Sequence, residues 1–276
     1  MPQYDIAILL PTRGRAEQLT RSVQSLLELA SKNTKIEILF GVDKDDSSNT
    51  EQFLKVLNPY LDQNKIDSKI LVFEPLGYAN LHHYVNTLAQ YSSSRWLFFW
   101  NDDALMQTPN WDEVICSYTG QFKLLSVHTH NSHPYSIFPI IPKEWYDCLN
   151  YISQHSLNDA WVSTIAYMLD IFERIPVYVE HDRHDLTGNN EDATYQQRVL
   201  LEGNQNHPLD FNHIDQQQKR LNDAAKLATW MQDQNMDLSF FVAVCDGRQD
   251  PWEKLHLNDP NNQISSEPTD LELNKT

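Results

Sequence analysis

The sequence predicts an α/β protein in which a mostly parallel β-sheet is flanked by helices. Over the first hundred residues, short apolar runs alternate with amphipathic segments. The run RWLFFW at residues 95–100 is continuously apolar, which is typical of a strand covered on both faces. Strands that alternate with helices indicate right-handed βαβ units, and such units place successive strands parallel in one sheet.

The first half of the chain supplies four expected strands separated by three expected helices. The first strand, YDIAILLPT, is an apolar run that stops at Pro11. The segment after it repeats apolar residues at intervals of three and four, which predicts a helix with one buried face. The alternation continues, so strands are expected at 4–12, 35–43, 68–74 and 95–100, and helices at 16–30, 49–61 and 80–92.

The alternation becomes less regular after residue 104. Helices are expected at 111–118, 141–152, 157–172 and 215–234, the last on the surface, and strands at 123–130, 174–182 and 238–246. The last residues are polar and have too little apolar surface to fold. We therefore expect a main domain over 1–210, with halves at 1–104 and 105–210, a C-terminal extension over 211–262, and a disordered tail over 263–276.

The composition disfavours several classes of protein. The formal net charge is −17, from 38 acidic and 21 basic residues, and no basic patch is visible, so the surface should repel nucleic acid and anionic lipid. The three cysteines are far apart, which fits a reducing compartment better than a disulfide framework. Neither a signal peptide nor an apolar window long enough to span a bilayer occurs. We expect a soluble, cytoplasmic protein.

Polar residues follow each of the first four expected strands, in loops that read PTRGR, VDKDDSS, EPLGYAN and NDDALM. Because the strands are parallel, these loops lie on one edge of the sheet, the edge at which α/β proteins bind ligands. The chain has neither a G-x-G-x-x-G motif after its first strand nor a Walker A loop. A divalent cation held by carboxylates is therefore the expected way to bind a phosphate here.

These segments resemble a known family. IAILLPTRGR, ILFGVDKDD and LGYANLHHYVNTLAQYSSSRWLFFWNDDALM are similar to the nucleotide-binding half of GT-A glycosyltransferases of the family 2 kind, and the resemblance covers roughly residues 4–200. It implies a GT-A-like, Rossmann-like fold in which residues 1–104 bind the nucleotide, and 105–210 bind the acceptor and complete a metal site. It also implies that the donor nucleotide is held by Thr12, Arg13, Arg15, Asp43 and Asp102.

The resemblance further implies a site for Mn²⁺ or Mg²⁺ after the fourth strand. The family's D-x-D motif, which holds the ion on the sugar-nucleotide diphosphate, corresponds here to NDD, so Asn101 replaces the first carboxylate and Asp103 matches the last. A histidine of the segment VYVEHDRHD is expected to complete the metal shell, with His184 as the first choice and His181 as the second. An imidazole beside oxygen ligands suits Mn²⁺ better than Mg²⁺.

The position of Asp159 allows two interpretations of its role. It lies near the start of an expected helix, capped by Ser156 or Asn158, where the helix dipole favours an acidic residue. The resemblance implies instead that Asp159 is the general base that acts on the acceptor hydroxyl. The neighbouring segment HTHNSHPYSIFPIIPKEWYD either lines the acceptor site with aromatic faces or belongs to the core, as we expect for Phe138.

The expected function is metal-dependent transfer of a sugar from a nucleotide-diphosphate sugar to a hydroxyl acceptor. The sequence leaves the acceptor open among a glycan, a lipid-linked sugar, a protein and a modified base, the last disfavoured by the acidic surface. Two alternatives stay open. One is a degenerate GT-A domain that binds the sugar nucleotide without turnover, which Asn101 favours. The other is a metallohydrolase that uses His128 and His130 with the HDRHD segment.

Overall fold

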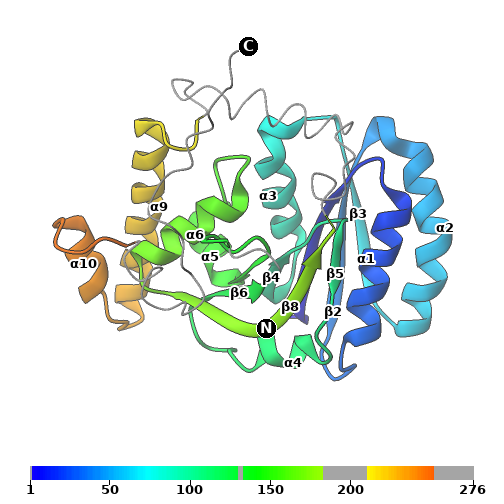
Figure 1. The fold of residues 1–276 in the computed structure, drawn as a ribbon, viewed down its shortest axis with the longest axis horizontal. Helices are drawn as coiled ribbons and strands as arrows, with labels where there is room; N and C mark the ends of the chain where they lie inside the picture. Colours follow the sequence, from blue (N-terminus) through cyan, green and yellow to red (C-terminus); the bar gives the residue numbers. More distant parts are fainter. Residues whose placement is uncertain (1, 130–132, 183–209, 252–276) are drawn as a thin grey trace, which may run out of the picture.

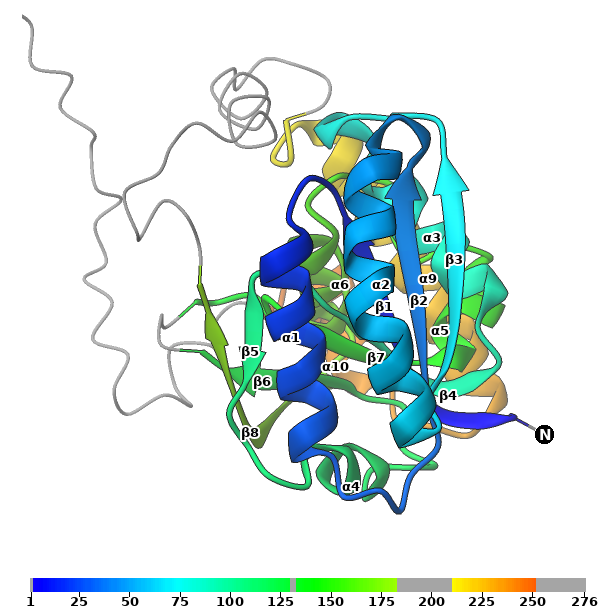
Figure 2. The same cartoon turned by 90° about the vertical axis from the view of Figure 1, so that its right-hand side faces the viewer.

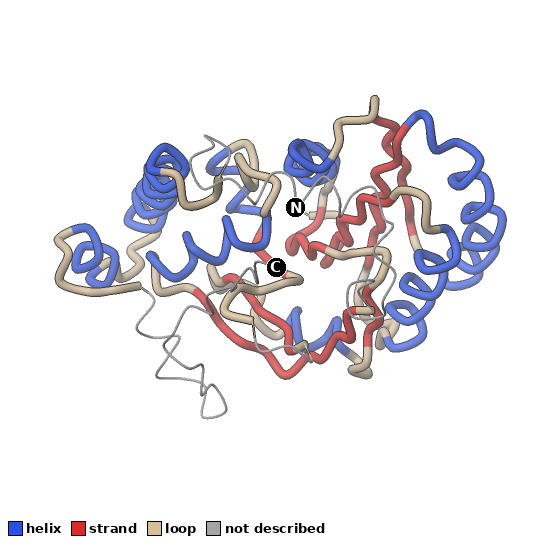
Figure 3. The backbone as a smooth tube through the Cα atoms, turned by 45° about the horizontal axis from the view of Figure 1, so that its top comes forward, coloured by secondary structure: helices blue, strands red, loops and turns tan. Residues whose placement is uncertain are grey.

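The structure, a computed structural model, describes residues 2–129, 133–182 and 210–251. Eight strands form a single sheet in the order β3-β2-β1-β4-β7-β6-β8-β5. Helices lie on both faces of this sheet, as Figures 1 and 3 show. The α/β class expected from the sequence is therefore confirmed. Within the described ranges, the helices lack the combination of length and apolar character that crossing a membrane requires.

The first half of the chain builds the parallel part of the sheet. Strand β1 is hydrogen-bonded in parallel to β2 on one side and to β4 on the other, and β2 pairs in parallel with β3. Every predicted element of this half is confirmed, with ends that differ by at most three residues. The elements are β1 (Tyr4–Thr12), α1 (Ala16–Leu29), β2 (Ile36–Asp43), α2 (Ser47–Asn64), β3 (Asp67–Phe73), α3 (Leu81–Tyr91) and β4 (Ser94–Phe99), with short 3₁₀ helices η1 (Lys44–Asp46) and η2 (Tyr78–Asn80).

The second half adds the antiparallel part. Strand β7 is antiparallel to both β4 and β6, β6 is parallel to β8, and β5 is antiparallel to β8. This half contains β5 (Ala104–Met106), α4 (Trp111–Cys116), β6 (Leu124–His128), β7 (Pro139–Pro142), α5 (Lys143–Leu149), α6 (Asn158–Met168), β8 (Phe172–His181), α9 (Ile214–Asp233) and α10 (Ser239–Cys245).

Three expectations for this half need correction. The short strands β5 and β7 were not predicted, and the helix expected from residue 141 begins at Lys143 because Ile141 pairs with Leu97 of β4. The strand expected at 238–246 is wrong, since Ser239–Cys245 form helix α10. A short apolar run such as SFFVAVC fits either a strand or a helix, and periodicity alone does not separate them.

Each face of the sheet carries its own hydrophobic core. On one face, residues of β1, β2 and β4 pack against α1, α2 and α4, while on the other face they pack against α3, α5, α6 and α9. The aromatic residues after residue 95 form much of both cores: Trp96, Phe98, Trp100, Trp111, Phe138, Trp145 and Trp161 are all fully buried. Phe138 and Trp145 therefore belong to the core rather than to an acceptor site.

Helix α9 was expected on the surface, but one side of it is buried against α5 and α6. Asp223, which has no exposed surface, accepts hydrogen bonds from Tyr151 Oη (2.5 Å), Trp161 Nε1 (3.1 Å) and Gln154 Nε2 (3.1 Å). Burial raises the pKa of Asp223 above its ordinary value, against the effect of these three donors. This one side chain thus fixes α9 to the start of α6.

Candidate functional site

The candidate site lies at the carboxyl edge of the parallel strands. The arrows of β2 and β3 in Figure 2 point to this same edge. Because β1 is hydrogen-bonded to both β2 and β4, the residue that ends β1 lies between the loops that follow its two neighbours. Thr12 ends β1, Asp43 ends β2, and Asp102 and Asp103 follow β4. The strand pairing itself therefore brings the polar loops of the sequence together.

Asp102 is held from two directions. Its Oδ2 atom accepts a hydrogen bond from Thr12 Oγ1 at 2.8 Å, and its Oδ1 atom accepts one from Arg15 Nη1 at 2.9 Å. Only 6% of Asp102 is exposed, and burial raises the pKa of this carboxyl above its ordinary value despite the nearby guanidinium. Arg15 Nη1 is also 3.6 Å from Asp103 Oδ2. One arginine thus compensates two adjacent buried carboxylates.

A second set of charged residues surrounds Asp43. Arg13 Nη1 lies 2.6 Å from Asp43 Oδ2 and 2.5 Å from Asp45 Oδ1. The hydroxyl of Tyr84, at the start of α3, donates to the other oxygen of Asp43. Burial and this hydrogen bond raise the pKa of Tyr84 to about 12. The backbone N–H of Gly14 donates to Asp46 at 2.8 Å, which holds the loop after β1 against the loop after β2.

Tyr84 was not singled out from the sequence, although a signal for it exists. It lies on the buried stripe of α3 with Val85, Leu88 and Ala89. A tyrosine on such a stripe places its hydroxyl among apolar neighbours, so the hydroxyl needs a hydrogen-bond partner. The partner, Asp43, lies 41 residues away in the chain, and the packing of α3 on the sheet brings it near.

Asp103 and His181 form the part of the site that suits a metal ion. His181 ends β8, opposite Ala104 of β5, and its Nε2 atom lies 3.2 Å from Asp103 Oδ1. Burial acts against the ionisation of Asp103, but the His181 ring and Arg15 outweigh it and lower the pKa of Asp103. The backbone N–H of Asp182 donates to the Asp103 carbonyl at 2.8 Å, which fixes the two segments together.

One buried polar atom of each residue in this pair lacks a hydrogen-bond partner. These atoms are Asp103 Oδ1 and His181 Nδ1, which are buried and take part in no hydrogen bond of good geometry. The atoms that could share one divalent cation such as Mn²⁺ are Asp103 Oδ1 and His181 Nε2, which lie 3.2 Å apart, whereas the unpartnered Nδ1 lies on the other side of the ring. No group of three or more such side chains occurs within the described ranges, and His184, the first choice from the sequence, lies outside them.

Asn101, which stands where the family's motif has its first carboxylate, also contacts His181. Its Nδ2 atom lies 3.5 Å from His181 Nε2, and its backbone carbonyl accepts a hydrogen bond from Ser22 Oγ at 3.0 Å. The His181 ring is also in edge-on contact with Phe138, with ring centroids 5.0 Å apart. His181 is thus positioned by an amide on one side and by a core aromatic ring on the other.

Asp159 lies in the first turn of α6, half-buried. Burial raises the pKa of Tyr135, and the negative charge of Asp159 adds to this rise while Arg220 opposes it. The segment after residue 132 packs on the same helix, since Ser136 N donates to Ser163 Oγ at 2.9 Å, and this segment continues to Phe138 beside His181. The structure thus connects the start of α6 to the Asp103–His181 pair through one short segment.

The cap expected for α6 is wrong. Leu157 occupies the N-cap position and makes no side-chain cap hydrogen bond, and Asn158 is already helical. The Leu157 N–H donates instead to His155 Nδ1 at 3.1 Å. Of the histidines in the metallohydrolase alternative, His128 ends β6 and is exposed, whereas His130 lies outside the described residues.

The comparisons with known proteins concern the fold. No family model and no curated protein matches the chain. Among solved structures, the chain is similar to residues 1–349 of S. aureus TarS, a GT-A-type glycosyltransferase, with 12% identity over 80% of each chain and a TM-score of 0.50. It is likewise similar to TarS 1–349 in complex with UDP-GlcNAc, with 12% identity, 79% of each chain covered and a TM-score of 0.50. This likeness shows that the fold is GT-A-like, as the sequence predicted.

Proposed function

We propose that this GT-A-like chain is a glycosyltransferase that moves a sugar from a nucleotide-diphosphate sugar to a hydroxyl acceptor, with Mn²⁺ or Mg²⁺. The observation that carries the proposal is the cluster of Asp102, Asp103, Arg15 and His181 at the carboxyl edge of the sheet. In open α/β sheets this edge is where ligands bind. The similar protein TarS has been solved with UDP-GlcNAc, so a UDP-sugar is the first donor to test.

The donor nucleotide would be bound by the loops after β1 and β2. Asp43 is oriented by Arg13 and Tyr84 and carries the hydrogen-bond acceptors that a ribose or a base requires. Arg15 contacts both carboxylates after β4, and an arginine at this point also suits the phosphate oxygens of a leaving diphosphate. Thr12, at the end of β1, donates a hydrogen bond to Asp102, in the loop after β4, at the edge of the sheet that the diphosphate would face.

A divalent cation would be held by Asp103 and His181, and His184 is retained as a third ligand proposed from the sequence. Bound there, the ion would neutralise the negative charge that develops on the departing diphosphate. The chain's own residues would then orient the donor and exclude water. Asp159 would accept the proton of the acceptor hydroxyl during attack on the anomeric carbon, because its position in the first turn of α6 favours the ionised form that a base needs.

Release of nucleoside diphosphate from a panel of nucleotide sugars, with and without Mn²⁺ and candidate acceptors, tests this function. We expect release that requires the metal and increases with an acceptor. Donor binding without release under any condition would support a degenerate binding domain, for which the specific observation is that Asn101 stands where the motif has its first carboxylate. If the protein binds none of the nucleotide sugars and releases no nucleoside diphosphate from them, the proposal is overturned.

A further inference from the structure

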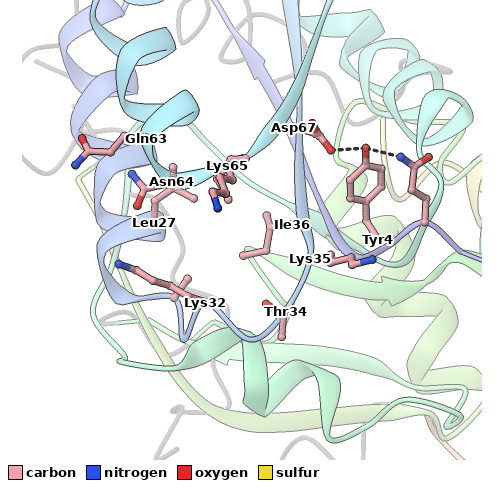
Figure 4. A pocket seen from close by; sticks show the side chains of 13 residues that line it. Tyr4, Leu27, Lys32, Thr34, Lys35, Ile36, Gln63, Asn64, Lys65 and Asp67 are labelled. Atoms are coloured by element: carbon pink, nitrogen blue, oxygen red, sulfur yellow. Dashed lines mark hydrogen bonds between the residues drawn. The ribbon is translucent and has the colours of Figure 1, made fainter.

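A cavity of about 550 Å³ lies at the opposite edge of the sheet from the candidate site. It is formed where β1, β2 and β3 begin and where α1 and α2 end, and Figure 4 shows the side chains around it. Tyr4 at this edge and Thr12 at the other are the two ends of β1. Eight steps of about 3.3 Å separate them by roughly 26 Å, so the cavity is distinct from the donor site.

The charge of the cavity is opposite to that of the protein. Lys32, Lys35 and Lys65 line it, and Asp67 is the one acidic side chain among the lining residues. Asp67 accepts a hydrogen bond from Tyr4 Oη at 2.7 Å. None of the three lysines forms an ion pair with a carboxylate of the described part of the chain. A chain with 38 acidic and 21 basic residues thus places, around one cavity, three lysines that form no ion pair with a described carboxylate.

The backbone at two of these lysines is also unusual. Lys32 (φ 67°) and Lys65 (φ 56°) adopt the left-handed conformation. The other described non-glycine residues with positive φ are Asn or Asp, whose short polar side chains tolerate that conformation: Asn110, Asn150, Asp170 and Asn235. Lys65 occupies the C-cap position of α2, where glycine or asparagine is the usual choice. The two lysines that depart from this rule line the same cavity.

We infer that this cavity binds a small phosphorylated molecule. Its volume is that of a small-molecule pocket, and lysine is a common ligand of phosphate because its ammonium is a compact charge on a flexible stem. In Figure 4, the amino groups of Lys32 and Lys35 point to opposite sides, so both can contact one phosphate only if their flexible stems rotate toward the cavity. Leu27 and Ile36 offer apolar surface to the rest of the ligand. Nucleic acid is disfavoured, because three lysines on a chain of net charge −17 cannot offset repulsion along a phosphate backbone.

Calorimetric titration with inorganic pyrophosphate in EDTA tests the inference. The variant Lys32→Asn/Lys35→Gln/Lys65→Asn removes the three charges and places a tolerant residue at both left-handed positions, so the fold should be retained. We expect its affinity for pyrophosphate to fall at least about tenfold. The matched control Lys55→Gln/Lys123→Gln/Lys219→Gln has the same net charge but changes lysines outside the cavity, and it should bind pyrophosphate as the wild type does.

Pyrophosphate also suits the arginines of the donor site, so a third variant, Arg13→Gln/Arg15→Gln, separates the two sites. The inference predicts that this variant keeps the pyrophosphate binding that the cavity variant loses. The inference is overturned by equal losses in both lysine variants, by a loss confined to the arginine variant, or by no binding to the wild type at millimolar pyrophosphate. Because donor binding is a separate measurement on separate residues, failure here leaves the proposed glycosyl transfer untouched.

Discussion

Replacing Asp103 by Asn tests whether metal and donor binding depend on this carboxylate. The change keeps the shape of the side chain but removes the charge from an oxygen that lies 3.2 Å from His181 Nε2. A ligand present at about one hundred times its Kd stabilises the folded state by about 2.7 kcal/mol. For a chain of this size, where 1 kcal/mol shifts Tm by about 2–4 °C, that corresponds to a shift of about 5–11 °C.

The assay compares the shift in Tm caused by UDP in Mn²⁺ with that in EDTA. We expect the wild type to show the larger shift in Mn²⁺, and Asp103→Asn to show in Mn²⁺ only the shift seen in EDTA. Without ligand, the variant should be slightly less stable at neutral pH. The folded-state pKa of Asp103 is lowered, so its carboxylate contributes stability that is present above the ordinary pKa of an aspartate and is lost as pH falls through the lowered value. The difference between variant and wild type should therefore shrink on acidification.

Asp112→Asn is the matched control. Asp112 is fully buried at the start of α4 and accepts hydrogen bonds from Ser31 N (2.9 Å), Ser31 Oγ (2.7 Å) and Thr34 Oγ1 (2.5 Å), away from the candidate site. Its replacement should lower Tm without ligand and leave the Mn²⁺-dependent shift intact. An undiminished Mn²⁺-dependent shift in Asp103→Asn would remove Asp103 from the metal site. An equal loss in both variants would show that the assay reports general destabilisation.

Three further predictions concern the same edge of the sheet and α6. Asp159→Asn should bind UDP and Mn²⁺ like the wild type but transfer sugar at least about a hundredfold more slowly. Near-normal transfer in a steady-state assay would show that Asp159 is not the general base and only stabilises the start of the helix. His181→Ala should weaken Mn²⁺-dependent binding of UDP in calorimetry while leaving binding in EDTA unchanged, and unchanged affinity in Mn²⁺ would remove His181 from the shell. The folded-state pKa of Tyr84 is raised from 10.0 to about 12, so its protonated hydroxyl contributes stability that is fully present below pH 10 and is lost as pH rises through about 12. Denaturation of Tyr84→Phe at several pH values should show a weaker loss of stability over that window than the wild type, and identical profiles would contradict the Tyr84–Asp43 hydrogen bond.

The first half of the fold was predictable because its signals are local. Strands β1 and β4 each contain a continuous apolar run, and helices such as α1 carry their own apolar stripe. The second half depends on pairing between distant segments. Pro139–Pro142 forms a strand because Ile140 and Ile141 pair with β4, about 43 residues earlier in the chain, and no local pattern records that pairing.

The residues of the candidate site also divide into those that local sequence signals predict and those that depend on pairing or packing between distant segments. Parallel strands place their following loops on one edge, so Thr12, Arg15, Asp43 and Asp102 could be grouped from the sequence alone. His181 was a second choice, because its approach to Asp103 depends on the antiparallel pairing of β5 with β8. Tyr84 was missed, since its partner is set by the packing of α3 on the sheet.

The anchoring of α9 by Asp223 bears on how the protein should be shortened for laboratory work. A chain cut before Ile214 would lose the acceptor for Tyr151, Gln154 and Trp161, three donors that lie on or beside α5 and α6. It would also uncover the apolar side chains that Ala224, Leu227, Ala228 and Met231 now shield. Freshly exposed apolar surface of this kind promotes aggregation. Truncations that keep α9 should therefore express in soluble form, and those that remove it should accumulate as inclusion bodies.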